Sequence, residues 1–173
     1  MGDTRVAGFS AATPRTRLAG RPWIRSLFAL ALVSTALALG PALAHAFELP
    51  NKIGLQRDSY FLVQQIYRGW STLGFLLFLE LGSMIALAVA LKGSGAAFRW
   101  VLAAILCVVA AQAVFWLFTQ PANVATANWT RIPDGWMGLR ACWEYSHLAG
   151  AVCQFMAFCS LVFSLLNHAM KPA

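Results

Sequence analysis

Two short motifs in this sequence place a carboxylate and an imidazole three residues apart. Glu144 and His147 open a long apolar run, whereas His45 and Glu48, in the opposite order, end an earlier one. Residues three apart are neighbours on one face of a helix, so the two groups of each pair can work together. The chain has only three histidines and six acidic residues, and two of each belong to these motifs. They are therefore the first candidates for chemistry.

Such pairs are typical of two kinds of site. Histidine titrates near neutrality, so a carboxylate–imidazole pair suits acid–base catalysis, with Glu144, His147, His45 and Glu48 as candidate catalytic residues. The same four residues are candidate metal ligands, because helical bundles bind metals through such pairs. Glu80 is the only candidate for a further carboxylate, so the carboxylates are too few for a full di-iron site. Three interpretations stay open: a polar network or organic-substrate pocket without a cofactor, a single metal or haem site, and unrelated surface residues.

The composition indicates a membrane protein. Of the 173 residues, 60% are hydrophobic and 11% are charged, whereas a soluble domain carries roughly 25% charged residues. The net charge of +7 does not predict a nucleic-acid partner, because basic residues gather before or at the start of the first apolar run. These residues are Arg5, Arg15, Arg17, Arg21 and Arg25. Such clustering is typical of a cytoplasmic segment next to a membrane span, so the lipid bilayer is the expected partner.

Four apolar runs are long enough to cross a bilayer, which needs roughly 20 apolar residues. The sequence therefore predicts an all-α fold, an integral membrane four-helix bundle over residues 23–170 that follows a disordered cytoplasmic tail at residues 1–22. The expected spans cover about residues 23–46, 70–91, 100–118 and 143–166. The basic turn at residues 92–99 belongs inside by the same charge rule, so both termini are expected to be cytoplasmic.

The first span has a second interpretation. Its basic start, apolar middle and the sequence Ala44-His45-Ala46 are also typical of a signal peptide with a small-residue cleavage site. A retained helix would have to accommodate Pro41, which membrane helices tolerate where neighbouring helices cover the freed carbonyl. We favour retention because the span carries one of the two polar motifs.

The mirrored order of the motifs predicts a shared site. The first span runs outward and the fourth runs inward, so His45 lies about one turn deeper than Glu48, and His147 lies about one turn deeper than Glu144. Three residues of helix rise ~4.5 Å, so the two pairs match in depth near the outer face. We therefore expect spans one and four to be adjacent, with all four side chains lining an outward-facing pocket.

Further residues are expected around this pocket. Tyr60, Arg68 and Arg140 should lie at its rim, where the two arginines could hold an anionic or phenolate group. The loop at residues 119–136 should partly close it. Tryptophans should supply flat apolar walls, and these are Trp116, Trp129 and Trp143.

Two alternatives concern the polar residues within the bundle. A purely structural network would pair Glu48 and Glu144 with Arg68 or Arg140 and leave the histidines bonded to backbone or to Tyr60. Separately, Glu80 in the middle of the second span should face the bundle, because a charged side chain at the bilayer centre costs ~2.5–3.5 kcal/mol on insertion scales. Its expected partners are Gln112 or a hydroxyl of the fourth span, such as Ser160.

Five stretches together resemble a family of small bacterial four-span membrane proteins, grouped with the anthrone-oxygenase-like domain of otherwise unknown function. The resemblance covers about residues 40–167. The stretches are HAFELPNKIGL at 45–55, YFLVQQIYRGW at 60–70, FWLFTQPAN at 115–123, NWT at 128–130 and LRACWEYSH at 139–147. It implies a four-helix protein of the bacterial inner membrane and cofactor-independent oxygenation of a phenolic, polyketide-like substrate.

Two classes of function follow from these observations. The first is a membrane oxidoreductase with an outward-facing Glu/His pocket for a small apolar or phenolic ligand, including Glu80 among its binding residues. The second is a non-enzymatic membrane accessory or transport-related protein whose polar cluster is structural. The cofactor is left open between none, a metal and a haem.

We predict that the first span is retained in the mature protein. The intact mass of the purified protein tests this, and the full-length mass is expected. A mature chain that begins at Phe47 would remove His45 and contradict a site shared by both motifs.

Overall fold

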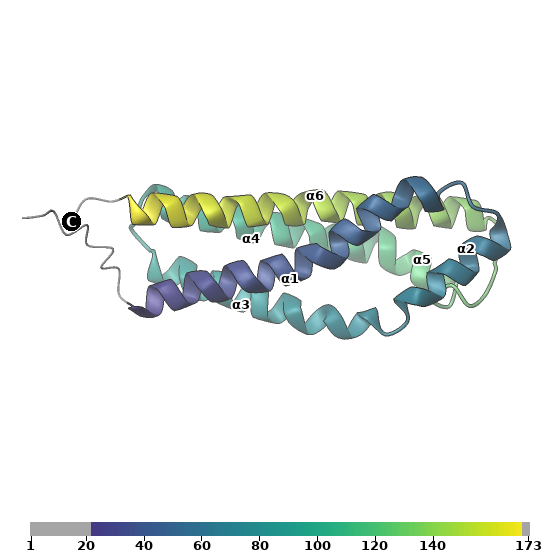
Figure 1. Ribbon diagram of the computed structural model, residues 1–173, viewed down its shortest axis with the longest axis horizontal. Helices are drawn as coiled ribbons and strands as arrows, with labels where there is room; N and C mark the ends of the chain where they lie inside the picture. Colours follow the sequence, from purple (N-terminus) through teal and green to yellow (C-terminus); the bar gives the residue numbers. More distant parts are fainter. Residues whose placement is uncertain (1–21, 171–173) are drawn as a thin grey trace, which may run out of the picture.

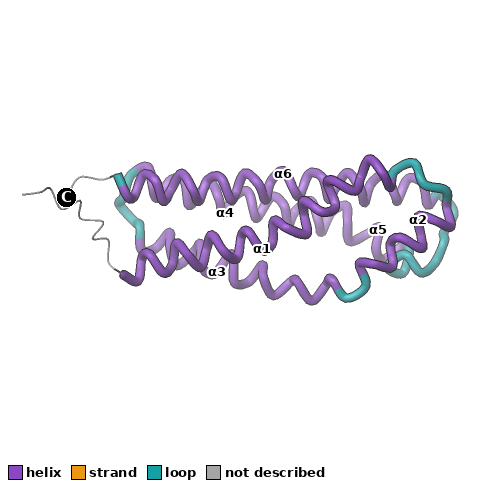
Figure 2. Tube along the Cα trace, viewed as in Figure 1, coloured by secondary structure: helices purple, strands orange, loops and turns teal. Residues whose placement is uncertain are grey.

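The computed structural model describes residues 22–170, which form helices and turns and contain no strand within that range (Figures 1 and 2). The predicted tail lies outside the described residues except for Pro22, which begins the first helix. The elements are α1 (Pro22–Lys52), α2 (Arg57–Gln64), η1 (Gln65–Tyr67), η2 (Trp70–Leu73), α3 (Gly74–Ala90), α4 (Ala96–Val114), η3 (Phe115–Thr119), α5 (Gln120–Ala125) and α6 (Trp136–Ala169).

Four helical stretches are long and apolar enough to cross a membrane, which confirms the predicted all-α multi-pass fold. Helix α6 packs along both α4 and α1, and α1 also packs against α3, whereas α3 and α4 share a smaller contact. The beginning of α1 and the end of α6 lie at one end of the bundle, and α2 and α5 lie at the other, which we call the loop end (Figure 1). Large apolar side chains stay exposed along the bundle, as a lipid-facing surface requires.

The helices are longer than the apolar runs predict. The first continues from residue 46 to Lys52, and the third spans residues 96–125. The predicted loop at 119–136 is therefore wrong in its first part. Pro121 lies at the first turn of α5, where a missing N–H is tolerated, and the π-helical turn η3 joins this turn to α4.

The fourth helix also begins earlier, at Trp136 rather than Trp143. The residue before it, Gly135, adopts φ +74°, a left-handed conformation that glycine reaches without strain. This turn redirects the chain from the loop into α6, so residues 136–142 add two helical turns at the loop end. These extra turns, together with the end of α1, build the walls of the site described below.

Two regions of packing hold the bundle. Near the chain ends, small and branched side chains of all four long helices form an apolar core around Phe28, Met84, Val101 and Leu161. At the loop end, a second cluster is aromatic and contains Tyr60, Phe61, Trp129 and Trp143 with Ala122. The first cluster fills the space between the four long helices, and the second packs the loops against the ends of the helices.

Glu80 faces the interior, as predicted, and is 1% exposed. Its partner differs from the expectation, because the side-chain amide of Gln154 on α6 donates to Glu80 Oε1, whereas no such bond joins it to Gln112 or Ser160. Gln154 lies six residues before Ser160 on the same helix, α6. A carboxyl group in the bilayer interior thus has a hydrogen-bond partner on a neighbouring helix.

We predict that Glu80→Gln preserves the fold and that Glu80→Leu destabilises it by ~1–3 kcal/mol, because leucine leaves the buried Gln154 amide without its acceptor. Thermal unfolding of the purified protein in detergent measures both changes. Equal stability of the wild type and the two variants would contradict a structural role for this bond.

Candidate functional site

The packing of α1 against α6 brings the two predicted imidazoles together. The rings of His45 and His147 stack with centroids 4.0 Å apart and an interplanar angle of 27°. The indole of Trp143 stands edge-on to both, at 5.1 Å from His45 and 4.2 Å from His147. Tyr67 and Trp70 also contact His45, at 4.5 and 5.4 Å. The depth match inferred from the mirrored motifs is therefore present at the imidazole level.

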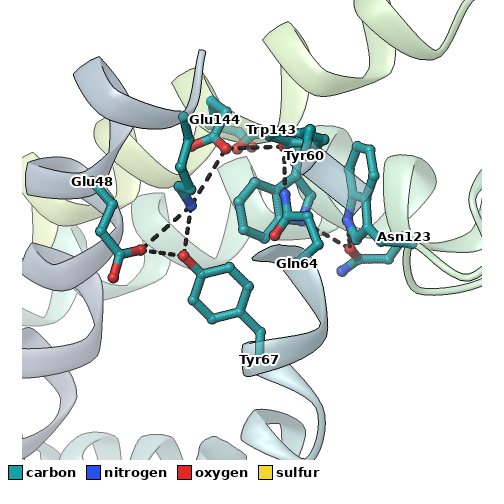
Figure 3. A network of polar contacts seen from close by, with 10 residues as sticks. Glu48, Tyr60, Gln64, Tyr67, Asn123, Trp143 and Glu144 are labelled. Atoms are coloured by element: carbon teal, nitrogen blue, oxygen red, sulfur yellow. Dashed lines mark hydrogen bonds and ion pairs between the residues drawn. The ribbon is translucent and has the colours of Figure 1, made fainter. Parts of the chain in front are cut away.

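The two carboxylates meet through a lysine rather than an arginine. Lys52, on the last turn of α1, is 3% exposed. Its Nζ lies 3.4 Å from Glu144 Oε1 on α6 and 3.5 Å from Glu48 Oε2 one turn earlier on α1. It also donates to the hydroxyl of Tyr67 at 2.6 Å, and that hydroxyl donates to Glu48 (Figure 3). One buried ammonium group thus links α1, α6 and η1.

Two tyrosines complete this network from the segment between α1 and α3. Tyr60, which is fully buried, donates to Glu144 Oε1 at 2.9 Å, and Gln64 donates to Tyr60 (Figure 3). Burial raises the pKa of Tyr60, and the nearby Glu144 carboxylate raises it further. Burial and the hydrogen bond to Glu48 likewise raise the pKa of Tyr67. Both phenols keep their protons at neutral pH and serve as hydrogen-bond donors to the carboxylates.

A strained turn covers the site at the loop end. Ala127, Asn128 and Trp129 all have positive φ values, from 50° to 63°, and each such residue costs roughly 1–2 kcal/mol when it is not glycine. Hydrogen bonds hold this turn: Asn128 N–H donates to the Asn123 carbonyl at 2.7 Å, and Gln65 Nε2 donates to the Trp129 carbonyl at 2.8 Å. Backbone strain maintained in this way is typical of functional loops.

One amide group fixes two aromatic walls of the site. Asn123 Oδ1 accepts hydrogen bonds from the indole N–H groups of Trp143, at 2.8 Å, and of Trp129, at 3.3 Å. Asn123 belongs to α5, Trp129 to the covering turn and Trp143 to α6. The helical continuation of the third span therefore positions both indoles, which are 4% and 3% exposed.

Two adjoining cavities lie beside the imidazoles. An inner cavity of about 770 Å³ extends into the bundle as far as Glu80 and Gln154. An outer cavity of about 790 Å³ lies beneath the covering turn and reaches Arg68 and Gln64. His147 lines both cavities, together with residues of α1, η2 and α5, so the two adjoin and are called the inner and outer lobes below. Pockets for small organic molecules usually measure ~300–1,000 Å³.

The predicted site residues fall into three groups. His45, His147, Trp143, Trp129 and Arg68 line the outer lobe. Trp116 and Glu80 line the inner lobe with His147. The remaining four, Glu48, Glu144, Tyr60 and Arg140, do not line the two lobes.

Glu48, Glu144 and Tyr60 belong to the polar network around Lys52, and neither predicted arginine forms an ion pair with the glutamates. Arg140 donates to the Leu55 carbonyl at 2.7 Å and lies over the rings of Tyr60 and Trp136. Arg68, which is exposed, donates to Gln65. The expected ion pairs of the glutamates with these arginines are therefore replaced by the pair with Lys52, because Lys52 extends from the same helix as Glu48 directly towards Glu144.

The arrangement does not fit a preformed metal site built from the two motifs. Within residues 22–170, no group of three or more histidine, cysteine, aspartate or glutamate side chains could hold a metal ion. The carboxylates face Lys52, and the imidazoles are stacked. Ring nitrogens direct their lone pairs within the ring plane, so two stacked rings do not converge on one metal between them.

Sequence reasoning missed Lys52, Tyr67, Gln64 and Asn123. Lys52 follows Glu48 by four residues, a spacing at which opposite charges pair on a helix, but this signal applied only once the helix was known to continue past Pro50. Asn123 had no usable signal, because its segment was expected to be a loop.

Comparisons of the chain with family models, curated proteins and solved structures return no match.

We predict that Lys52→Met destabilises the protein by ~3–5 kcal/mol, because it leaves the buried Glu144 carboxylate without its cation. The double variant Lys52→Met/Glu144→Gln should recover part of this loss, since it removes the unpaired charge. Chemical unfolding in detergent measures both. Arg57→Met is the control, because its ion pair with Asp58 is exposed and its removal should cause no measurable change. A single variant as stable as the wild type would contradict the proposed network.

Proposed function

We propose that this membrane protein binds a flat, lipid-soluble, weakly acidic aromatic molecule, such as a phenol, in the two-lobed cavity. The observation that carries the proposal is the position of His147, which lines both lobes between the aromatic walls of the outer one and the mainly apolar walls of the inner one. An imidazole nitrogen accepts a hydrogen bond from a phenolic hydroxyl. Indole and phenol rings nearby offer edge and face contacts to a flat ligand.

The lining of the inner lobe supports a lipid-soluble ligand. Phe78 of α3 and Trp116 of η3 both line this lobe, and they are 80% and 63% exposed on the bundle surface. That surface belongs to two membrane-spanning stretches. A ligand dissolved in the bilayer would therefore reach the cavity between α3 and the third span without crossing the polar loop end.

In the enzymatic form of this proposal, His147 accepts the proton of the bound phenol-type molecule. Removal of that proton makes an electron-rich anion, the species that reacts in the cofactor-independent oxygenation implied by the resemblance to anthrone-oxygenase-like proteins. Arg68 at the outer lobe supplies a positive charge for the anion. Glu144 does not act with His147 in this scheme, because it is engaged with Lys52 and Tyr60.

The carboxylate layer supports a second, structural role alongside the first. Lys52, Glu48, Glu144 and the two tyrosines bond to one another and do not border the inner lobe. In the accessory-protein alternative, the whole polar cluster serves only to pack the loop end. The two proposals differ in what His147 does, and binding experiments separate them.

We further propose a bacterial inner-membrane location with both chain ends cytoplasmic. Arg25, Lys92 and Arg99 lie at or near the end of the bundle opposite α2 and α5, and the sequence adds four arginines before Pro22 and Lys171 after α6. At the loop end, Glu48, Asp58, Asp134 and Glu144 offset the basic residues. This distribution favours a loop end that faces the outside.

We predict saturable binding of β-naphthol to the protein in lipid nanodiscs, measured by naphthol fluorescence. β-Naphthol should bind more tightly than its methyl ether, which has no hydroxyl proton. His147→Leu should remove this preference, a loss of about tenfold for one hydrogen bond of ~1.4 kcal/mol, and His147→Gln should retain part of it. His168→Gln is the control, because His168 is not among the residues that line either lobe.

Two results would contradict the proposal: no saturable binding of either compound, or a preference that His147→Leu leaves unchanged. Dioxygen uptake with anthrone then separates enzyme from binding protein, because oxidation of anthrone by dioxygen yields anthraquinone and water. Uptake that depends on His147 favours the enzyme, whereas binding without uptake of dioxygen favours a carrier or accessory role.

A further inference from the structure

The floor of the inner lobe contains a buried carboxyl group that the proposed function does not use. Glu80 on α3 and Gln154 on α6 both line this lobe and are 1% and 7% exposed. Gln154 donates to Glu80 Oε1. A carboxyl group with its two oxygens has capacity for further hydrogen bonds. Among the described residues, Glu80 is the only acidic side chain that lines the inner lobe.

The stripe of α6 between His147 and Gln154 is built from small residues. His147, Gly150, Ala151 and Gln154 all line the inner lobe, and their spacing places them on one helix face. A Cβ atom added at Gly150 would meet nothing within 4 Å, so this part of the wall borders open space. Seven residues of helix rise ~10 Å, which is the axial separation between the backbone positions of His147 and Gln154.

The part of α1 that borders the same lobe also carries short side chains. Ala38, Pro41 and Ala42 contribute short side chains to it. The lining of the lobe is mainly apolar, although it also includes Gln112 and Gln120. His147 lies where the two lobes join, the Glu80–Gln154 pair lies at the floor, and short side chains of α1 and α6 lie between them. A flat molecule that extends along this stripe would present one end to each.

We propose that the ligand is bifunctional, with a hydrogen-bond donor at its far end that binds the Glu80–Gln154 pair while its phenol-type hydroxyl binds His147. This inference rests on the proposed function and specifies the substrate class for the same cavity. A hydroxyl or N–H group at the far end satisfies the carboxyl oxygen. A purely apolar far end leaves that oxygen without this bond.

The experiment compares β-naphthol with a naphthalene diol whose two hydroxyls lie at opposite ends, both in nanodiscs. The wild type should bind the diol about tenfold more tightly than β-naphthol, the gain expected for one further hydrogen bond. Glu80→Leu should abolish this preference, so that the diol and β-naphthol bind to this variant with similar affinity. Glu80→Gln should retain part of the preference, because its carboxamide oxygen still accepts. Gln154→Met is the second variant if Glu80→Leu does not fold, and it should reduce the preference as well.

A matched pair of glycine variants tests the position of the ligand. Gly150→Leu should fill the space beside the stripe and weaken binding of both compounds at least tenfold. Gly82→Leu is the control, because Gly82 is exposed on the surface of α3, does not line either lobe and also has no neighbour within 4 Å of an added Cβ. Equal binding by the two variants would overturn the proposed position.

The outcomes separate this inference from the function on which it rests. If β-naphthol binds with dependence on His147 but the diol gains nothing, the bifunctional ligand is excluded and the proposed function stands. A diol preference that Glu80→Leu leaves intact likewise excludes recognition at the floor. Failure of both compounds to bind the wild type would overturn the proposed function itself.

Discussion

A single ammonium group between two helices governs the loop end of this bundle. Lys52 Nζ lies within 3.5 Å of carboxylates from both α1 and α6 and is almost fully removed from solvent. A buried charge without a partner costs several kcal/mol, so the lysine and Glu144 strongly favour the arrangement in which the helices stay together. Hydrogen bonds from Tyr60 and Tyr67 tie the segment between α1 and α3 to the same network.

This constraint separates the carboxylates from the cavity. Because the carboxylates face Lys52, the imidazoles one turn deeper on each helix are left to stack on each other and to border the cavity. The aromatic cluster, held by Asn123, covers the outer lobe. Farther into the membrane, the only acidic side chain of the inner lobe among the described residues is paired with Gln154. Polar groups thus occur in three layers, each with a different set of neighbours.

The sequence was sufficient for the fold because membrane spans depend on long apolar runs, and those runs are unambiguous here. It also predicted the meeting of His45 with His147, since opposite chain directions convert the mirrored motifs into equal depth. The helix ends were harder to predict. The segments after Ala46 and Phe118 contain prolines and polar residues that resemble loops, yet both are helical because they pack at the loop end.

Because the helix ends were expected to be loops, part of the site was not predicted. With the first span expected to end near residue 46, Lys52 falls outside the predicted helix, and the expected partners of Glu48 are arginines. Asn123 was likewise placed in a loop, so its bonds to two indoles were not foreseeable. Tyr67 lies fifteen residues beyond Lys52, and only the fold of the connecting segment brings the two side chains together.

The Lys52 network fixes α1 against α6 and thereby stacks His45 on His147. Magic-angle-spinning NMR of histidine-labelled protein in bilayers tests this directly, because the chain has only three histidines. We expect a through-space contact between two imidazole rings that disappears on substitution of His45 or His147, persists on substitution of His168 and weakens in Lys52→Met. Three imidazoles with no mutual contact, or a contact that Lys52→Met leaves unchanged, would contradict the account.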